Sequence, residues 1–140
     1  QPASGWSGAR FGDDADRDHD EWLADVLQFM SALSEKIRKA REIRVPVGGK
    51  TFIVLRPTTL DMIDLQGRSA ARAIIPHIIG WEGVTSLDLY PGGDGAPVPF
   101  DADACAEWLS DRVDFLGPIA QAAVEAYDTH RQRIEDDAKN

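Results

Sequence analysis

The stretch that decides the fold covers residues 42–55 and reads EIRVPVGGKTFIVL. Two runs rich in β-branched residues flank a Gly-Gly pair, and that pattern is typical of a β-hairpin with a two-residue turn. The turn places Val45 opposite Phe52 and Ile43 opposite Val54. Because cross-strand partners point to the same side of a sheet, these four side chains are expected to form one apolar face.

The same register places Val47 opposite Lys50 and puts Pro46 at a non-hydrogen-bonded pair, where the missing N–H of proline points outward. The proline also blunts that edge of the hairpin against pairing with another strand. A two-stranded hairpin alone is only marginally stable in water. We therefore expect the hairpin to pack on helices.

Four helical regions are predicted around the hairpin, at 19–41, 59–79 with a break, 101–111 and 117–136. The first rests on apolar residues that recur every three or four positions, as on one face of a helix. These residues are Trp22, Val26, Phe29, Met30, Leu33 and Ile37. Acidic residues gather at the start of this region and basic residues at its end, which complements the helix dipole.

Local signals shape the second helical region. Thr58 and Asp61 have the spacing of a capping box, in which each residue hydrogen-bonds the backbone of the other at the start of a helix. Gly67 is expected to interrupt the helix, and Pro76 is expected to kink or end it.

A long loop rich in glycine and proline is predicted at 80–100, and loops of that length are usually functional or mobile. After it, Asp101 is a suitable N-cap, and Pro118 suits the first position of the last helix. The predicted fold class is α+β, mostly α-helical, with one β-hairpin. Residues 1–17 are expected to be a flexible acidic arm, and residues 18–140 a single helical domain that contains the hairpin and the loop.

Composition limits the classes of partner. The chain has 140 residues and a net charge of -9, which opposes binding to nucleic acid or to an anionic membrane surface. No apolar run approaches the roughly 20 residues that a membrane-spanning helix needs. The first residues lack a secretory pattern. The sequence therefore predicts a soluble cytoplasmic protein with no nucleic-acid partner and no membrane partner.

No sequence pattern indicates catalysis or a bound cofactor. The glycine-rich segment 92–95 lacks the Gly-Lys-Ser/Thr ending of a phosphate-binding loop, and the nearby aspartates miss the spacing of a calcium loop. No second histidine or cysteine follows or precedes His77 at the sequence spacing that is typical of a metal site. Cys105 is the only cysteine and is expected to be a small apolar residue on a helix. We therefore expect no enzyme activity, no catalytic residue, no cofactor and no metal.

The segment IIGWEGV, residues 78–84, carries a large aromatic residue and a carboxylate between two glycines. Gly80 and Gly83 permit backbone angles that other residues resist. Two interpretations stay open. Either Trp81 and Glu82 are presented on a tight recognition turn, or Trp81 fills the core and Glu82 caps nearby amide groups.

A family resemblance appears at this point of the chain. GWEGV at 80–84, PVPF at 97–100 and the Ala-rich segment AQAAVEAY at 120–127 resemble small tail-assembly-chaperone-like proteins of tailed phages and prophages. The hairpin and the helix start that follows it, within 47–65, are also similar, so the resemblance covers about residues 42–140. The connection at 85–96 is longer than is usual in that family, and residues 1–41 have no clear counterpart in it.

The resemblance implies a non-enzymatic phage tail assembly factor that transiently binds tail-tube or tape-measure protein in the bacterial host cytoplasm during virion morphogenesis. It identifies no client-binding residues. From the unusual turn and the loop, we predict that Trp81, Glu82, Val84 and Phe100 bind the partner. Self-association is a further option. The alternatives are a structural tail or neck component of the virion, and a small hydrolase or ligand-binding protein.

Overall fold

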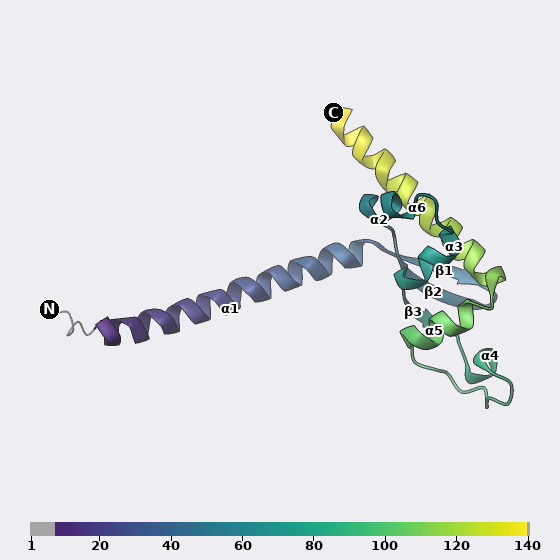
Figure 1. Ribbon diagram of the computed structural model, residues 1–140, viewed down its shortest axis with the longest axis horizontal. Helices are drawn as coiled ribbons and strands as arrows, with labels where there is room; N and C mark the ends of the chain where they lie inside the picture. Colours follow the sequence, from purple (N-terminus) through teal and green to yellow (C-terminus); the bar gives the residue numbers. More distant parts are fainter. Residues whose placement is uncertain (1–7, 140) are drawn as a thin grey trace. The chain divides into compact units, whose positions relative to one another are not determined.

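The computed structural model describes residues 8–139, and it describes side-chain surroundings from residue 19 onward. The chain divides into two compact units, which meet between Ala40 and Arg41 (Figure 1). Each unit is described by itself below.

The first unit contains one long helix, α1, which runs from Gly8 to Ala40. The helix predicted at 19–41 therefore begins earlier. Of the predicted flexible arm, residues 1–7 lie outside the described residues, and residues 8–17 are helical. The first turn of α1 holds no acidic residue, whereas Arg38 and Lys39 stand in its last turn as expected.

The second unit is built on an antiparallel sheet of three strands in the order β1-β2-β3. The strands are β1 (Glu42–Val47), β2 (Lys50–Leu55) and β3 (Ile78–Glu82). The predicted hairpin and its register are confirmed, with Val45 paired to Phe52 and Ile43 paired to Val54.

The hairpin turn uses both of its glycines. Gly48 and Gly49 have φ angles of 59° and 81°, which is the left-handed region that a tight two-residue turn requires. A Cβ on Gly48 would lie 2.9 Å from Cε1 of Phe115, so the turn also packs directly against an aromatic ring.

The predicted fold class is wrong in its β part, because the hairpin has a third strand. Ile78–Glu82 pairs with β2, so that Phe52 lies opposite Trp81. The predicted helix end at residue 79 and the loop start at 80 are both wrong for this reason. Pro76 ends the helical segment in a 3-10 turn, η1 (Ile75–His77), and the β-branched residues that follow extend along the free edge of β2.

The second predicted helical region is two short helices, α2 (Thr59–Leu65) and α3 (Ala70–Ile74). The break predicted at Gly67 is confirmed, since that residue has a φ of 81°. The capping box is confirmed as well: the Thr58 N–H donates to Asp61 Oδ2 at 2.9 Å, and the Asp61 N–H donates to Thr58 Oγ1 at 3.1 Å.

The remaining helices are α4 (Ser86–Leu89), α5 (Ala102–Leu109) and α6 (Val113–Lys139). Asp101 caps α5 as predicted, by accepting a 2.9 Å bond from the Ala104 N–H. The last helix begins before the predicted residue 117, with Pro118 inside it. A proline ring disfavours helical geometry in the residue before it by contact with that residue's Cβ. Gly117 has no Cβ, so the helix passes through the proline.

The core of the second unit lies between one face of the sheet and helices α3, α5 and α6 (Figure 1). Its centre is aromatic. The ring of Phe52 lies 6.2 Å from that of Trp108 on α5 and 6.1 Å from that of Phe115 on α6. Phe52 and Val54, two residues of the predicted apolar face of the hairpin, are fully buried, and so is Ile119 on α6.

Candidate functional site

Trp81 lies in the core rather than on a recognition turn. Its side chain is only 7% exposed. The indole Nε1–H donates to the Val98 carbonyl at 2.8 Å, and the ring meets Phe100 and Trp108 edge-on, with centroid distances of 5.1 and 6.0 Å. Trp81 therefore joins β3 to α5 and to the end of the long loop. This geometry favours the interpretation in which Trp81 fills the core.

Gly80 and Gly83, which flank Trp81 and Glu82, have roles in the packing and the end of β3. A Cβ on Gly80 would lie 3.2 Å from Cδ1 of Ile53, so the glycine makes room for a side chain of the neighbouring strand. Gly83 has a φ of 82°, which turns the chain where β3 ends. Neither glycine presents the tryptophan to solvent.

The other predicted partner-binding residues divide by exposure. Val84 is 2% exposed, and Phe100 is partly buried against the core. Glu82 is exposed and forms an ion pair with Arg44, which raises the pKa of that guanidinium, mainly through the hydrogen bond. Exposed ion pairs of this kind contribute little to stability, because water and salt screen them. Of the predicted set, Glu82 is the most exposed, and a binding role for these residues stays a prediction.

The segment after β3 is held together by hydrogen bonds to the side chain of Ser86. The buried Ser86 hydroxyl donates to Asp94 Oδ1 at 2.7 Å and accepts bonds from the N–H groups of Asp94 and Gly95 at 3.0 and 3.1 Å. A Cβ on Gly93 would lie 2.5 Å from the Ser86 carbonyl carbon, so the two stretches of backbone touch. Bonds from the Ala96 N–H and from Ser86 lower the pKa of Asp94.

The short helix α4 is tied to the hairpin. Asp88 accepts from the Thr85 N–H at 2.8 Å and completes a capping box. It also forms a 3.0 Å ion pair with Lys50, which stands at the start of β2. The Thr85 hydrogen bond, and after it Lys50, lower the pKa of Asp88. These bonds hold α4 in a fixed position.

The surface that this ordered loop presents is apolar. Leu87 and Tyr90 are 58% and 55% exposed, although the bonds of Ser86 and Asp88 hold the segment to which both belong. Beside them a shallow groove runs between α4 and α5, with Glu107 and Asp111 exposed at its edge. Its lining residues are Leu89, Tyr90, Ala104, Glu107, Trp108 and Asp111. We refer to Leu87 together with this groove as the α4 surface.

Within the segment 80–100, sequence reasoning and the structure single out different side chains. Within 80–100 it favoured Trp81, because tryptophan is enriched at binding sites, and it missed Leu87 and Tyr90. The spacing of Thr85 and Asp88 was the available signal. It indicates a capping box, and hence a short helix on which Leu87 faces outward.

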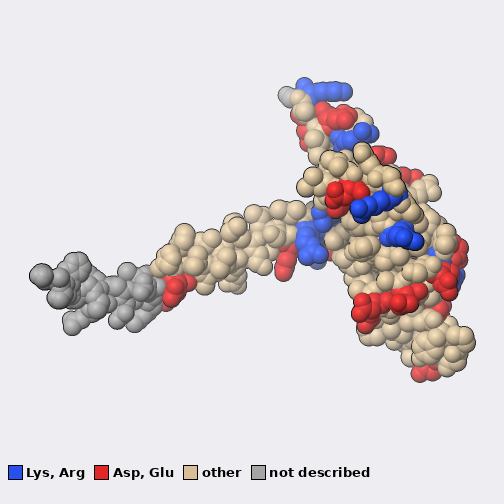
Figure 2. Space-filling view, viewed as in Figure 1, with Lys and Arg blue, Asp and Glu red and all other residues tan. Residues whose placement is uncertain are grey.

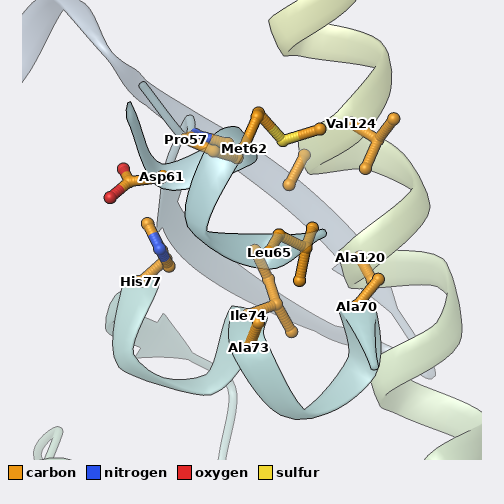
Figure 3. Close-up of a pocket in the computed structure, with 11 residues that line it drawn as sticks. Pro57, Asp61, Met62, Leu65, Ala70, Ala73, Ile74, His77, Ala120 and Val124 are labelled. Carbon is orange, nitrogen blue, oxygen red and sulfur yellow. The ribbon is translucent and has the colours of Figure 1, made fainter. Parts of the chain in front are cut away.

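A second concave feature lies between α2, α3 and α6 (Figure 3). Its walls are apolar, and its volume of about 30 Å³ holds little more than one water molecule. Asp61 and His77 stand at its edge (Figure 3). Burial pushes the pKa of Asp61 upward, but hydrogen bonds from Thr58 outweigh it and leave that pKa lowered. The feature has the size of a packing gap.

Two observations concern nucleophilic and metal-binding groups among the described residues. Cys105 is 1% exposed, and burial raises the pKa of its thiol to about 11, so the reactive thiolate is scarce near neutral pH. Among the side chains that the structure describes, at residues 19–139, no group of three histidine, cysteine or acidic residues is arranged to hold a metal ion. Within the described part of the chain, no helix is long and apolar enough to cross a membrane.

One family model matches the chain. Residues 24–140, which include about half of α1 and the whole second unit, match the model described as YdaY prophage protein. No curated protein and no solved structure matches the chain. The match covers far more than half of the sequence and includes the strands, the ordered loop and the α4 surface. The chain therefore belongs to the YdaY prophage protein family.

Proposed function

We propose that the protein is a non-enzymatic tail assembly factor, which transiently binds tail-tube or tape-measure protein in the cytoplasm of the bacterial host. The observation that carries the proposal is the α4 surface, where Leu87 and Tyr90 are exposed on a rigid base. Membership in a prophage protein family and the resemblance of residues 42–140 to tail assembly chaperones support it. Such a role requires a reversible contact and no covalent chemistry.

The apolar and acidic side chains of the α4 surface indicate which kind of client segment it would bind. Exposed apolar side chains on a rigid support bind an apolar segment without first losing much conformational entropy. The carboxylates of Glu107 and Asp111 at the edge of the groove favour a client segment that also carries lysine or arginine. The net charge of -9 attracts such a segment and opposes nucleic acid and anionic membranes as partners.

The predicted partner-binding residues take revised roles in this proposal. Trp81 and Val84 hold the loop from within the core, and Phe100 packs against the indole. Leu87 and Tyr90 make the contact with the client. A change at Trp81 then weakens binding only indirectly, by loosening the support of α4.

The test is capture of tail-tube and tape-measure proteins of the same prophage by the purified, tagged chain. Leu87→Asp with Tyr90→Asp should abolish capture and leave the melting curve nearly unchanged. The matched control is Leu60→Asp with Ile63→Asp, since these α2 residues are 72% and 53% exposed and lie elsewhere on the same unit. Unchanged capture by the α4 variant, or equal loss in the control, would refute the α4 surface as the site.

Purified virions separate this proposal from a structural role in the tail or neck. A transient factor is absent from finished particles, whereas a tail or neck component is present in fixed numbers. Mass spectrometry of particles from an induced lysogen therefore decides between the two.

A further inference from the structure

Helix α1 carries a wide apolar face that none of the described side chains of its own unit covers. Seven of its large apolar side chains are between 39% and 68% exposed. They are Trp22, Leu23, Leu27, Phe29, Met30, Leu33 and Ile37. Helices in proteins draw most of their stability from packing such a face, so an exposed face of this length indicates a missing partner.

The spacing of these residues specifies a helix as the partner. Leu23, Met30 and Ile37 recur every seven residues, and Val26 and Leu33 recur between them in the same period. This is the a and d pattern of a coiled coil, in which the apolar residues of one helix insert between those of another. The pattern continues to the end of α1 with Ala40 at a d position.

Charge along α1 identifies the partner and its direction. Asp20, Glu21 and Asp25 lie toward one end of the apolar stretch, and Lys36, Arg38 and Lys39 lie toward the other. Figure 2 shows this helix as mostly uncharged surface, with acidic atoms beside the grey segment and basic atoms, together with some acidic ones, at the opposite end. An antiparallel copy of the same helix places each acidic end beside a basic end, whereas a parallel copy places like charges together.

We propose that α1 forms an antiparallel two-stranded coiled coil with α1 of a second copy of this chain. The apolar residues fit that arrangement, because a positions then meet d positions. Met30 lies opposite Leu33 of the second copy, and Val26 lies opposite its Ile37. Trp22 flanks this seam and faces Lys36 of the second copy, where the ammonium group and the indole attract each other.

The pairing is independent of the proposed function, since α1 and the α4 surface belong to different units. A dimer would present two α4 surfaces, and two weak contacts on one client hold it more tightly than one. The dimer is nevertheless tested without any client.

Sedimentation equilibrium of the full chain should show a dimer. Met30→Asp places a carboxylate in the seam twice per dimer and should weaken dimerisation by about 100-fold or more. Gln28→Asp adds the same carboxylate on the outer face of α1, two residues away, and should leave the dimer intact. A chain that is monomeric at about 100 μM, or a dimer that Met30→Asp does not weaken, overturns the proposal.

Salt and distance measurements establish the direction. Antiparallel pairing joins opposite charges, so added salt should weaken the dimer, whereas parallel pairing predicts the reverse. Spin labels placed by Ser31→Cys should lie close together across the dimer, and labels placed by Ala24→Cys should lie about 22 Å apart along the axis, at 1.5 Å per residue. The buried Cys105 should not take up label. Short distances at both sites overturn the antiparallel arrangement.

A monomer in which Met30→Asp lowers the melting temperature of the second unit also overturns the proposal. In that case α1 would be covered by its own chain. Binding of the apolar face to tail protein instead of to a second copy is distinguished in the same way, because the isolated chain would then be monomeric.

Discussion

Replacing Trp81 by alanine should destabilise the second unit strongly. The side chain is 7% exposed, and its loss leaves a void between the rings of Phe100 and Trp108 and an unbonded Val98 carbonyl. Truncation of a buried aromatic side chain costs about 3–5 kcal/mol. For a unit of this size that corresponds to a fall in melting temperature of at least about 12 °C.

The assay is urea denaturation followed by far-ultraviolet circular dichroism, with two companion variants. Trp81→Phe keeps most of the apolar volume but removes the indole N–H, so it should cost about 1–3 kcal/mol, mainly from the unpaired Val98 carbonyl. Glu82→Ala breaks only an exposed ion pair with Arg44 and should change the free energy of unfolding far less than Trp81→Ala. A cost below about 1 kcal/mol for Trp81→Ala, with an unchanged denaturant slope, would refute the core interpretation.

Three further predictions follow from the loop and the core. Gly93→Ala should destabilise the α4 surface by about 1–3 kcal/mol, because its Cβ would lie 2.5 Å from the Ser86 carbonyl carbon; thermal melts and client capture should both report the loss. Cys105 should react slowly with a maleimide at pH 7 and faster as pH rises toward about 11, whereas fast labelling at pH 7 would contradict its burial. Stability should fall in acid, since the lowered pKa of Asp88 means that the folded state binds this proton less readily than the unfolded state. Its contribution is therefore present above about pH 4 and is lost as pH falls through the folded-state pKa, and Asp88→Asn should flatten that part of the melting profile.

The hairpin was predictable because its signals are local. A Gly-Gly pair between β-branched runs fixes both the turn and the register, and every predicted cross-strand pair is present. The capping residues Thr58 and Asp101 were predictable for the same reason, since a cap depends on residues three positions apart. Such signals require no knowledge of the tertiary structure.

The third strand was not predictable by the same means. Ile78 and Ile79 continue the apolar character of the preceding helices, and a short apolar run does not distinguish a strand from a buried helix. Residues 78–82 form a strand because they pair with the free edge of β2, and β2 lies more than twenty residues earlier in the sequence. The burial of Trp81 depends on the same strand, because a tryptophan on β3 opposite Phe52 lies in the core.

The length of the last helix and the candidate site illustrate two other limits. Pro118 was expected to start a helix, yet Gly117 before it lets the helix begin at Val113. The α4 surface depends on the Ser86 hydroxyl, which joins residues eight and nine positions apart. Glycines and aspartates alone predict a flexible loop, and only the tertiary structure shows that they form a fixed support.

The measurement that tests the central claim most directly is binding of the purified chain to purified tail-tube protein and to purified tape-measure protein, by isothermal titration calorimetry. The proposed function predicts that at least one of them binds, that Leu87→Asp with Tyr90→Asp abolishes the heat of binding, and that Leu60→Asp with Ile63→Asp preserves it. If neither protein binds the intact chain, or if the α4 variant binds as well as the original sequence, the account of this protein as a tail assembly factor acting through the α4 surface is contradicted.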